Sequence, residues 1–285
     1  MAYRSSGANN DELVENLKSF GIIHTPRVYQ ALRHVDRGEF MPEEHRSQAY
    51  QDQPFCTGYL STVAGLLLEG RGVNHGLEIE GELLSYARRA HAVFCHKEEE
   101  RTASRRTVTS ATFFQGNVYE LDEEKSMRYD RVYIGAACPE SMKDKLLSLL
   151  LPGNGVLVGP MGDELVKITR GRKEGEYTTT VLSAVRFASL KEPGPPSRRF
   201  HLPAPLWTPV LHYTYPRTFQ LAAKALLLLG AGKRQGGKKV GRAVPPAVWM
   251  EVLSFVDRQW FEPEPGCGVG SRCEGREGGG EERGN

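Results

Sequence analysis

The sequence lacks several features that would assign it to a broad class of protein. Its longest apolar run, residues 222–229, is interrupted by Lys224 and is much shorter than the roughly 20 apolar residues that cross a bilayer as a helix. The opening residues, MAYRSSGANNDE, contain no apolar segment of a signal peptide. The 5 cysteines include no C-x-x-C pair and the 8 histidines no H-x-x-x-H pair, so the sequence offers neither a disulfide framework nor a zinc pattern. We therefore expect free thiols, no metal site, no membrane partner, and a location in the cytoplasm or the nucleus. His75, inside a β-like run, is expected to be a packed core residue rather than a ligand.

Charge of one sign is also missing. The 285 residues include 37 lysines and arginines against 35 aspartates and glutamates, which gives a net charge of +2. With no dominant charge, the overall composition does not favour a nucleic-acid partner. The apolar fraction of 39% and the charged fraction of 25% are ordinary for a globular chain, and the length suits one domain with an appendage.

A loop with two or three spaced glycines is absent, but residues 56–80 retain the order of elements that follows such a loop. A turn at Gly58 leads into an apolar helical segment, residues 60–68, and then into a β-like run that ends on Glu78. This order is typical of the second half of a nucleotide-binding βαβ unit, in which helix N–H groups and an acidic residue after the next strand hold the ligand. The same pattern allows Gly58 to be a plain turn glycine and Glu78 an ordinary strand-end carboxylate.

Helices and strands are predicted to alternate along most of the chain, which indicates an α/β class: a doubly wound, Rossmann-like sheet, mostly parallel, with flanking helices. Two amphipathic helices come first, at residues 9–20 and 25–38. The charged run at residues 97–106 is expected to be an exposed loop. The later strands are predicted at residues 111–115, 131–134, 156–158, 165–169 and 179–190, the last as an exposed antiparallel edge.

The last third of the chain, from residue 191, is predicted to be an appendage to the α/β domain. Residues 191–209 carry six prolines and are expected to form a linker or an arm over the surface. A helix near residues 245–261 has an apolar stripe on a piece too small to hold its own core, so it needs a partner; the stripe comprises Val248, Val252 and Phe255, with Trp249 and Leu253 beside it. The predicted divisions are 1–190 for the α/β domain, 191–242 for the arm, a short helix and a basic linker, 243–262 for the apolar docking segment, and 263–285 for a disordered tail.

Several stretches together resemble the protein-L-isoaspartate O-methyltransferase family, and most closely its branch of methyltransferase domain-containing proteins with an extra C-terminal region. They occur in the family's order and cover residues 9 to about 190. The stretches are LVENL at residues 13–17, VDRGEF at 35–40, AYQDQP at 49–54, TGYLST at 57–62, NHGLE at 74–78, GN at 116–117, YDRVYIGAA at 129–137, residues 150–161, and VRFASL at 185–190.

The resemblance implies S-adenosylmethionine as the cofactor and protein or peptide substrates with isoaspartyl residues. It places Gly58, Tyr59 and Leu60 near the amino-acid end of the cofactor, Glu78 on the ribose, and Asn117 and Val118 with Gly116 beside the adenine. Asn117 stands where the main branch of the family usually has aspartate. Asp52 falls in a motif on the substrate side, although a simple loop cap is an alternative role for it.

The resemblance is interrupted between Pro54 and Thr57. In the family this interval holds the substrate loop, a helix, and the first strand of the sheet with the opening of the cofactor loop, whereas here only Phe55 and Cys56 stand between them. No catalytic residue is therefore assigned. The absent strand is a central one, where the strand order reverses and the ligand binds. Because each large aliphatic residue lost from such a strand forfeits roughly 1.5 to 3 kcal/mol of burial, we predict a weakened sheet that lacks one central strand.

Three functions follow from these observations. The first is a carboxyl methyltransferase that repairs damaged Asp and Asn sites in proteins. The second is a non-catalytic adaptor, because the apolar C-terminal helix resembles the short box by which substrate receptors dock onto ubiquitin-ligase scaffolds; Trp249, Leu253 and Phe255 would make that contact. The third is a shortened product that folds poorly and does neither.

Overall fold

The computed structural model describes most of the chain up to residue 255. The described residues are 5–51, 58–101, 108–194, 198–209, 211–212, 215, 217–230, 234–235, 238–239 and 246–255. Asp52, which the sequence places on the substrate side, and the predicted tail at residues 263–285 lie outside them.

The chain begins with two short helices whose ends follow from local sequence signals. The Asn9 side chain accepts a hydrogen bond of 2.9 Å from the Glu12 N–H, which caps the first helix, and Thr25 and Pro26 begin the second. Both predicted helices are present, but the second ends at His34 rather than near Gly38, and a 3₁₀ turn follows it. The elements are α1 (Asn10–Ser19), α2 (Pro26–His34), η1 (Arg37–Phe40) and η2 (Glu43–Gln48).

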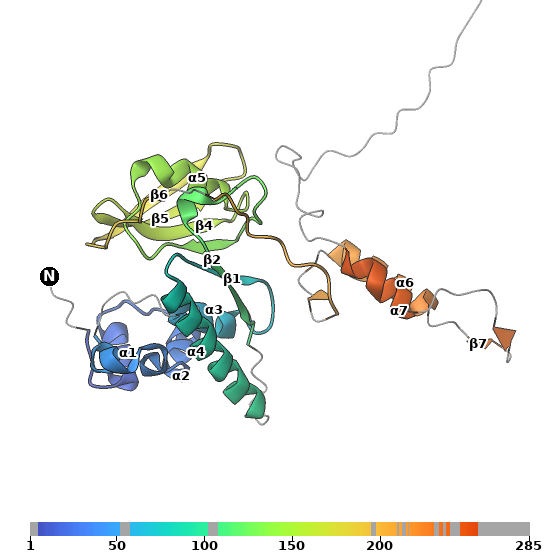
Figure 1. Cartoon of the computed structure of the whole chain (residues 1–285), viewed down its shortest axis with the longest axis horizontal. Helices are drawn as coiled ribbons and strands as arrows, with labels where there is room; N and C mark the ends of the chain where they lie inside the picture. Colours follow the sequence, from blue (N-terminus) through green and yellow to red (C-terminus); the bar gives the residue numbers. More distant parts are fainter. Residues whose placement is uncertain are drawn as a thin grey trace, which may run out of the picture.

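A strand–helix–strand unit follows, and it matches the predicted order of elements. Helix α3 (Tyr59–Leu68) leads into β1 (Asn74–Glu78), and α4 (Gly81–Glu100) connects β1 to β2 (Ala111–Gln115). The two strands are parallel and in register from Asn74 opposite Ala111 to Glu78 opposite Gln115. Helices α1 to α4 gather on one side of this strand pair (Figure 1). The unit thus brings the ends of β1 and β2 to a common edge.

The charged run at residues 97–100 is the end of α4, so its prediction as an exposed loop is wrong there; residues 102–107 lie outside the described part of the chain. Glu98 is buried, with only 6% of its surface exposed. Its carboxylate lies 2.8 Å from His34 Nε2 and 2.7 Å from Arg101 Nη1. A buried carboxylate needs such partners, and the sequence run alone does not reveal the contact with α2.

A second, four-stranded sheet forms the other half of the α/β domain. Its order is β3-β4-β5-β6, with β3 and β4 parallel and the later pairs antiparallel. Strand β6 is the exposed antiparallel edge that the sequence predicts, but it ends at Ala184 rather than at residue 190. A core of aliphatic side chains, among them Leu150, Leu157 and Ile168 at 0% exposure, lies between this sheet and α5. The elements are β3 (Arg131–Tyr133), α5 (Lys143–Ser148), β4 (Val156–Met161), β5 (Glu164–Arg170) and β6 (Tyr177–Ala184).

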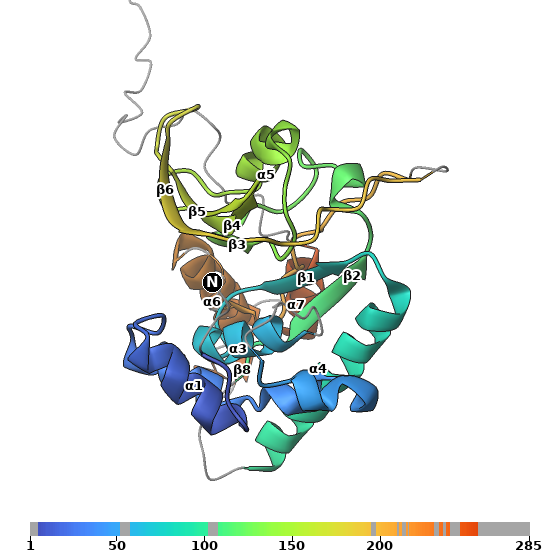
Figure 2. The ribbon, with the colours of Figure 1, turned by 90° about the vertical axis from the view of Figure 1, so that its left-hand side faces the viewer.

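The two sheets are separate, and the break falls between β1 and β3. β1 and β2 lie between the helices α1 to α4 and the four-stranded sheet (Figure 2). His75 of β1 bridges the break, because its Nδ1 lies 2.7 Å from the Tyr129 hydroxyl and its ring packs edge-on against Phe114. The mixed α/β class is confirmed, the sheet is discontinuous as the missing interval predicts, and His75 is a packing residue.

The apolar helix near residues 245–261 packs within the appendage, against segments that precede it in the chain. Trp207, Tyr215, Phe219, Ala223 and Leu253 form a buried cluster between the proline-rich arm, α6 and α7. Leu253 is only 4% exposed, whereas Phe255 is 69% exposed. The elements are α6 (Arg217–Gly230), α7 (Pro246–Ser254) and the two-residue strands β7 (Arg234–Gln235) and β8 (Lys238–Lys239).

Two of the five cysteines lie in the described part of the chain, and both are free thiols. Burial raises the pKa of Cys95 and of Cys138 to about 11, so neither is a thiolate at neutral pH. Among the described residues, no helix has the length and apolarity to span a bilayer, and no three His, Cys, Asp or Glu side chains gather as metal ligands.

Candidate cofactor site

The carboxyl ends of β1 and β2 bring together residues that the sequence assigns to a single site. Glu78 and Gln115 are the last residues of the two strands and lie opposite each other. The Gly116 N–H donates a hydrogen bond of 3.0 Å to the Glu78 carbonyl. Ligands of open α/β sheets bind at this edge, so Glu78 and the segment after β2 are placed where a nucleoside could contact both.

The Glu78 carboxylate is half-buried and held by the backbone. Its Oε1 accepts a hydrogen bond of 2.9 Å from the Glu80 N–H. Its other oxygen has no hydrogen bond from the described residues. Carboxylate oxygens are acceptors only, so this oxygen can receive the hydroxyl protons of a ribose. The arrangement suits the role that the sequence proposes for Glu78.

Gly58 begins α3 in a conformation that favours glycine. Its φ is +83°, in the left-handed region, and an added Cβ would lie 3.0 Å from the Cβ of Ala87 on α4. The missing side chain therefore lets the start of α3 approach α4 closely. The first N–H groups of a helix have no partner within the helix, so those of Tyr59 and Leu60 can meet a ligand.

The side chains of these two residues do not share one role. The Tyr59 ring turns into the helical cluster, with its centroid 5.9 Å from that of Phe40, and burial raises the pKa of its hydroxyl to about 12. Leu60 is exposed. Tyr59 can therefore serve a cofactor through its backbone rather than through its phenol.

A buried histidine, His91, which was not selected from the sequence, connects the Gly58 turn to β2. His91 Nε2 accepts a hydrogen bond of 2.8 Å from the Ala111 N–H, so the neutral ring carries its proton on Nδ1. That proton faces Thr62 Oγ1 at 2.8 Å, and the Thr62 hydroxyl donates at 3.0 Å to the Gly58 carbonyl. Burial lowers the pKa of His91, which keeps the ring neutral. The available signal was its position on the face of α4 that carries Ala87 and Phe94.

Replacing Thr62 with valine is expected to destabilise the protein by about 1 to 3 kcal/mol, because the buried His91 Nδ1–H loses its acceptor while the side-chain shape is kept. Thr62→Ser retains the hydroxyl and serves as the matched control. Urea unfolding of both variants measures the difference. Equal stability of the valine and serine variants would show that the hydroxyl bridge contributes nothing.

Asn117, which follows β2, is buried and engaged at both ends of its side-chain amide. Its Oδ1 accepts a hydrogen bond of 3.1 Å from the Tyr119 N–H and so caps the 3₁₀ turn η3 (Val118–Glu120). Its Nδ2 donates at 2.8 Å to the carbonyl of Lys191 in the arm. Val118 is half-buried and packs against the core of the second sheet. The structure thus places both residues beside Gly116 but turns their side chains to internal contacts.

A cavity of ≈ 310 Å³ opens next to this segment. Its lining comprises Gln115, Gly116, Glu120, Arg198, Arg199 and Phe200. Neither Gly58 nor Glu78 is among the residues that line it.

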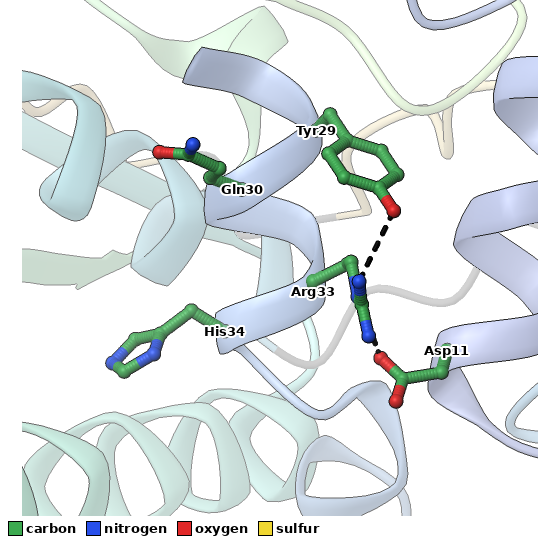
Figure 3. A pocket seen from close by; sticks show the side chains of 5 residues that line it. All are labelled: Asp11, Tyr29, Gln30, Arg33 and His34. Atoms are coloured by element: carbon green, nitrogen blue, oxygen red, sulfur yellow. Dashed lines mark hydrogen bonds and ion pairs between the residues drawn. The ribbon is translucent and has the colours of Figure 1, made fainter. Parts of the chain in front are cut away.

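A second cavity, of ≈ 400 Å³, lies between α1 and α2 and contains none of the predicted site residues; Asp11, Tyr29, Gln30, Arg33 and His34 line it (Figure 3). Arg33 bridges the two helices there, with Nε 2.8 Å from Asp11 Oδ1 and Nη1 3.1 Å from the Tyr29 hydroxyl. The Arg33 hydrogen bond holds the pKa of Asp11 below its usual value. This exposed ion pair is explained by the packing of α1 against α2, and we do not assign a catalytic or binding role to it.

Comparisons with known proteins identify similar chains. The model of the family described as protein-L-isoaspartate(D-aspartate) O-methyltransferase matches residues 8–78. A protein-L-isoaspartate O-methyltransferase of Staphylothermus marinus is 30% identical over 201 residues, which cover 59% of this chain and 87% of that protein. The corresponding protein of Methanopyrus kandleri is 29% identical over 176 residues, covering 54% of this chain and 76% of that protein.

Solved structures are also similar. One of them is named as a protein-L-isoaspartate O-methyltransferase from Plasmodium falciparum in complex with S-adenosyl-L-homocysteine. The TM-score is 0.49 at 20% sequence identity, over 65% of this chain and 99% of that chain.

Proposed function

The chain belongs to the protein-L-isoaspartate O-methyltransferase family, and from this premise we propose that it is an S-adenosylmethionine-dependent methyltransferase acting on isoaspartyl carboxylates of proteins. The observation that carries the proposal is the common edge of β1 and β2, where Glu78 lies directly beside Gly116. A carboxylate at this position suits a ribose, and the helix N-terminus at Gly58 supplies N–H donors for a carboxylate group.

The residues present fit this cofactor in their chemistry. Gly58 leaves the start of α3 without a side chain, and the Glu78 oxygen that the Glu80 N–H does not occupy can accept hydroxyl protons. The proposed assignments are therefore Gly58, Tyr59 and Leu60 through the backbone, and Glu78 through its carboxylate. S-adenosylmethionine, when bound, supplies an already activated methyl group.

The demands of this reaction on side-chain chemistry are small. An isoaspartyl carboxylate is ionised at neutral pH and needs no general base, so the protein has to hold, align and desolvate the reacting groups. This agrees with the lack of a catalytic base among the proposed site residues. Asp52 remains the proposed substrate-side residue, and it lies outside the described part of the chain.

A methyl-transfer assay tests the proposal. The protein is incubated with S-adenosylmethionine carrying a labelled methyl group and with an isoaspartyl peptide, and base-labile methyl esters are counted. The peptide with ordinary aspartate at the same position is the control. We expect ester on the isoaspartyl peptide alone; ester on neither peptide, from a folded sample, would contradict the proposed activity.

The adaptor function stays an untested prediction, and the structure limits which of the proposed docking residues are exposed. Of the three residues proposed for docking to a ubiquitin-ligase scaffold, Leu253 is buried in the cluster of the appendage and Trp249 is partly covered. Phe255 is exposed, as are Val248 and Val252. A cytoplasmic or nuclear location and the lack of a nucleic-acid partner likewise remain predictions from composition.

A further inference from the structure

The described residues of the arm, 191–194 and 198–209, contact the segment that follows β2. The Phe200 N–H donates at 3.3 Å to the Glu120 carbonyl, and the Phe200 carbonyl accepts at 2.7 Å from the Asp122 N–H. Nearer the start of the arm, the Lys191 ammonium pairs with the Glu80 carboxylate. Figure 2 shows this yellow-to-orange part of the chain passing beside the end of β2. The arm therefore lies along the same edge as the proposed cofactor site.

The orientation of the Asn117 amide is fixed by its two partners. The Tyr119 N–H requires an acceptor and the Lys191 carbonyl requires a donor, so only one placement of the oxygen and the nitrogen satisfies both. An aspartate at this position could accept from Tyr119 but could not donate to Lys191. The asparagine, which replaces the family's usual aspartate, is thus explained by the arm.

The cavity beside this segment has the character of a site for a flat heterocycle. The Phe200 ring lies over Gly116 so closely that an added Cβ on Gly116 would come within 2.4 Å of it. Gln115, whose amide offers both donor and acceptor atoms, also lines the cavity, as do Glu120, Arg198 and Arg199. The Glu120 Oε1 accepts a hydrogen bond of 2.9 Å from the Arg198 N–H. The cavity volume of ≈ 310 Å³ reaches the lower end of the range for ligand pockets, about 300 to 1,000 Å³. Glu78 lies opposite Gln115, one of the residues that line the cavity, in the strand pair.

We propose that residues 198–200 of the arm form the wall of the nucleoside end of the cofactor site, with the Phe200 ring against the base, and that Asn117 is a positioning residue that anchors the arm through Lys191. This inference rests on the proposed function, because the nucleoside is that of S-adenosylmethionine. It differs from the role that the resemblance implies for Asn117, since the amide is committed to Tyr119 and Lys191 and does not read the adenine.

Amide hydrogen exchange, measured with and without S-adenosylhomocysteine, tests whether the arm contacts the nucleoside. We expect the ligand to slow exchange of the amides of residues 198–202 in the wild-type protein. The isosteric change Asn117→Asp should speed exchange in the arm, leave the Tyr119 amide protected, and weaken binding about tenfold by calorimetry. Asn154→Asp, the same change in an exposed turn, is the matched control and should alter neither property. Phe200→Leu, which keeps the anchor but removes the ring, should also weaken binding.

Two results would overturn the inference while leaving the proposed function intact. One is binding of S-adenosylhomocysteine without any change of exchange at residues 198–202. The other is an Asn117→Asp variant whose arm exchanges faster but whose affinity is unchanged. If the folded wild-type protein binds no S-adenosylhomocysteine, both the proposed function and the proposed role of Phe200 in the cofactor site are wrong. Hydrogen exchange of the Asn117→Asp variant without ligand still shows whether Asn117 anchors the arm.

Discussion

Replacing Gly58 with valine is expected to lower the free energy of unfolding by about 2 to 5 kcal/mol and to abolish cofactor binding. Gly58 has a φ of +83°, a conformation that costs a residue with a Cβ roughly 1 to 2 kcal/mol. An added Cβ would also lie 3.0 Å from the Ala87 Cβ and 3.2 Å from the Ala87 Cα, so α3 must shift away from α4. Overpacking of this kind typically costs about 1 to 3 kcal/mol.

Gly21 provides the matched control for this change. It also has a positive φ, +69°, but an added Cβ would meet nothing within 4 Å. Gly21→Val therefore isolates the conformational cost, which we expect to be about 1 to 2 kcal/mol, without the contact at Ala87. Urea unfolding of both variants measures the two losses. If they are equal, the close approach of α3 to α4 at Gly58 does not constrain the fold.

A loss of stability in acid is the second large expected effect, and it is assigned to His75. Burial lowers the pKa of His75 from 6.5 to about 4 in the folded protein. Below pH 6.5 the unfolded chain therefore binds a proton that the folded chain does not. As the pH is lowered from 6.5 toward the folded pKa of about 4, the free energy of unfolding decreases. A shift from 6.5 to about 4, at 1.36 kcal/mol per unit, corresponds to a loss of about 2 to 3 kcal/mol between pH 7.5 and pH 4.

His75→Gln separates this loss from the titration of the carboxylates. Glutamine does not titrate and can keep a hydrogen bond to the Tyr129 hydroxyl across the break between the sheets. We expect the stability advantage of the wild-type protein over the variant to shrink by about 2 to 3 kcal/mol from pH 7.5 to pH 4, in urea unfolding at each pH. A constant difference over this range would mean that His75 titrates normally and does not bridge the sheets in solution.

Local signals in the sequence were sufficient for much of the fold. Asn9 and the Thr25-Pro26 pair mark the starts of two helices, and the strand at residues 111–115 is found with its predicted bounds. The break between β1 and β3 was predictable because the interval after Pro54 lacks any segment with strand character. These features depend on neighbouring residues or on a missing stretch, both of which a sequence displays directly.

The features that escaped prediction depend on partners distant in sequence. Glu98 is buried because His34, on α2, approaches its carboxylate, and Leu253 is buried because it packs in one cluster with Trp207 of the arm and with α6. His91 joins the site through Thr62 and the Ala111 N–H, none of which is adjacent to it. Asn117 was predicted from the resemblance to lie beside the adenine, which stays a prediction, and its contact with Lys191 could not be inferred without the path of the arm.

Calorimetric titration with S-adenosylhomocysteine, comparing the wild-type protein with Glu78→Gln, tests the central claim most directly. Loss of a charged acceptor costs about 1.5 to 3 kcal/mol, so we predict binding by the wild type and affinity roughly 10- to 100-fold weaker in the variant. Glu82→Gln, an exposed change in the first turn of α4, should bind like the wild type. A folded wild-type protein that shows no binding, or a Glu78→Gln variant that binds equally well, would contradict the placement of the cofactor at the ends of β1 and β2.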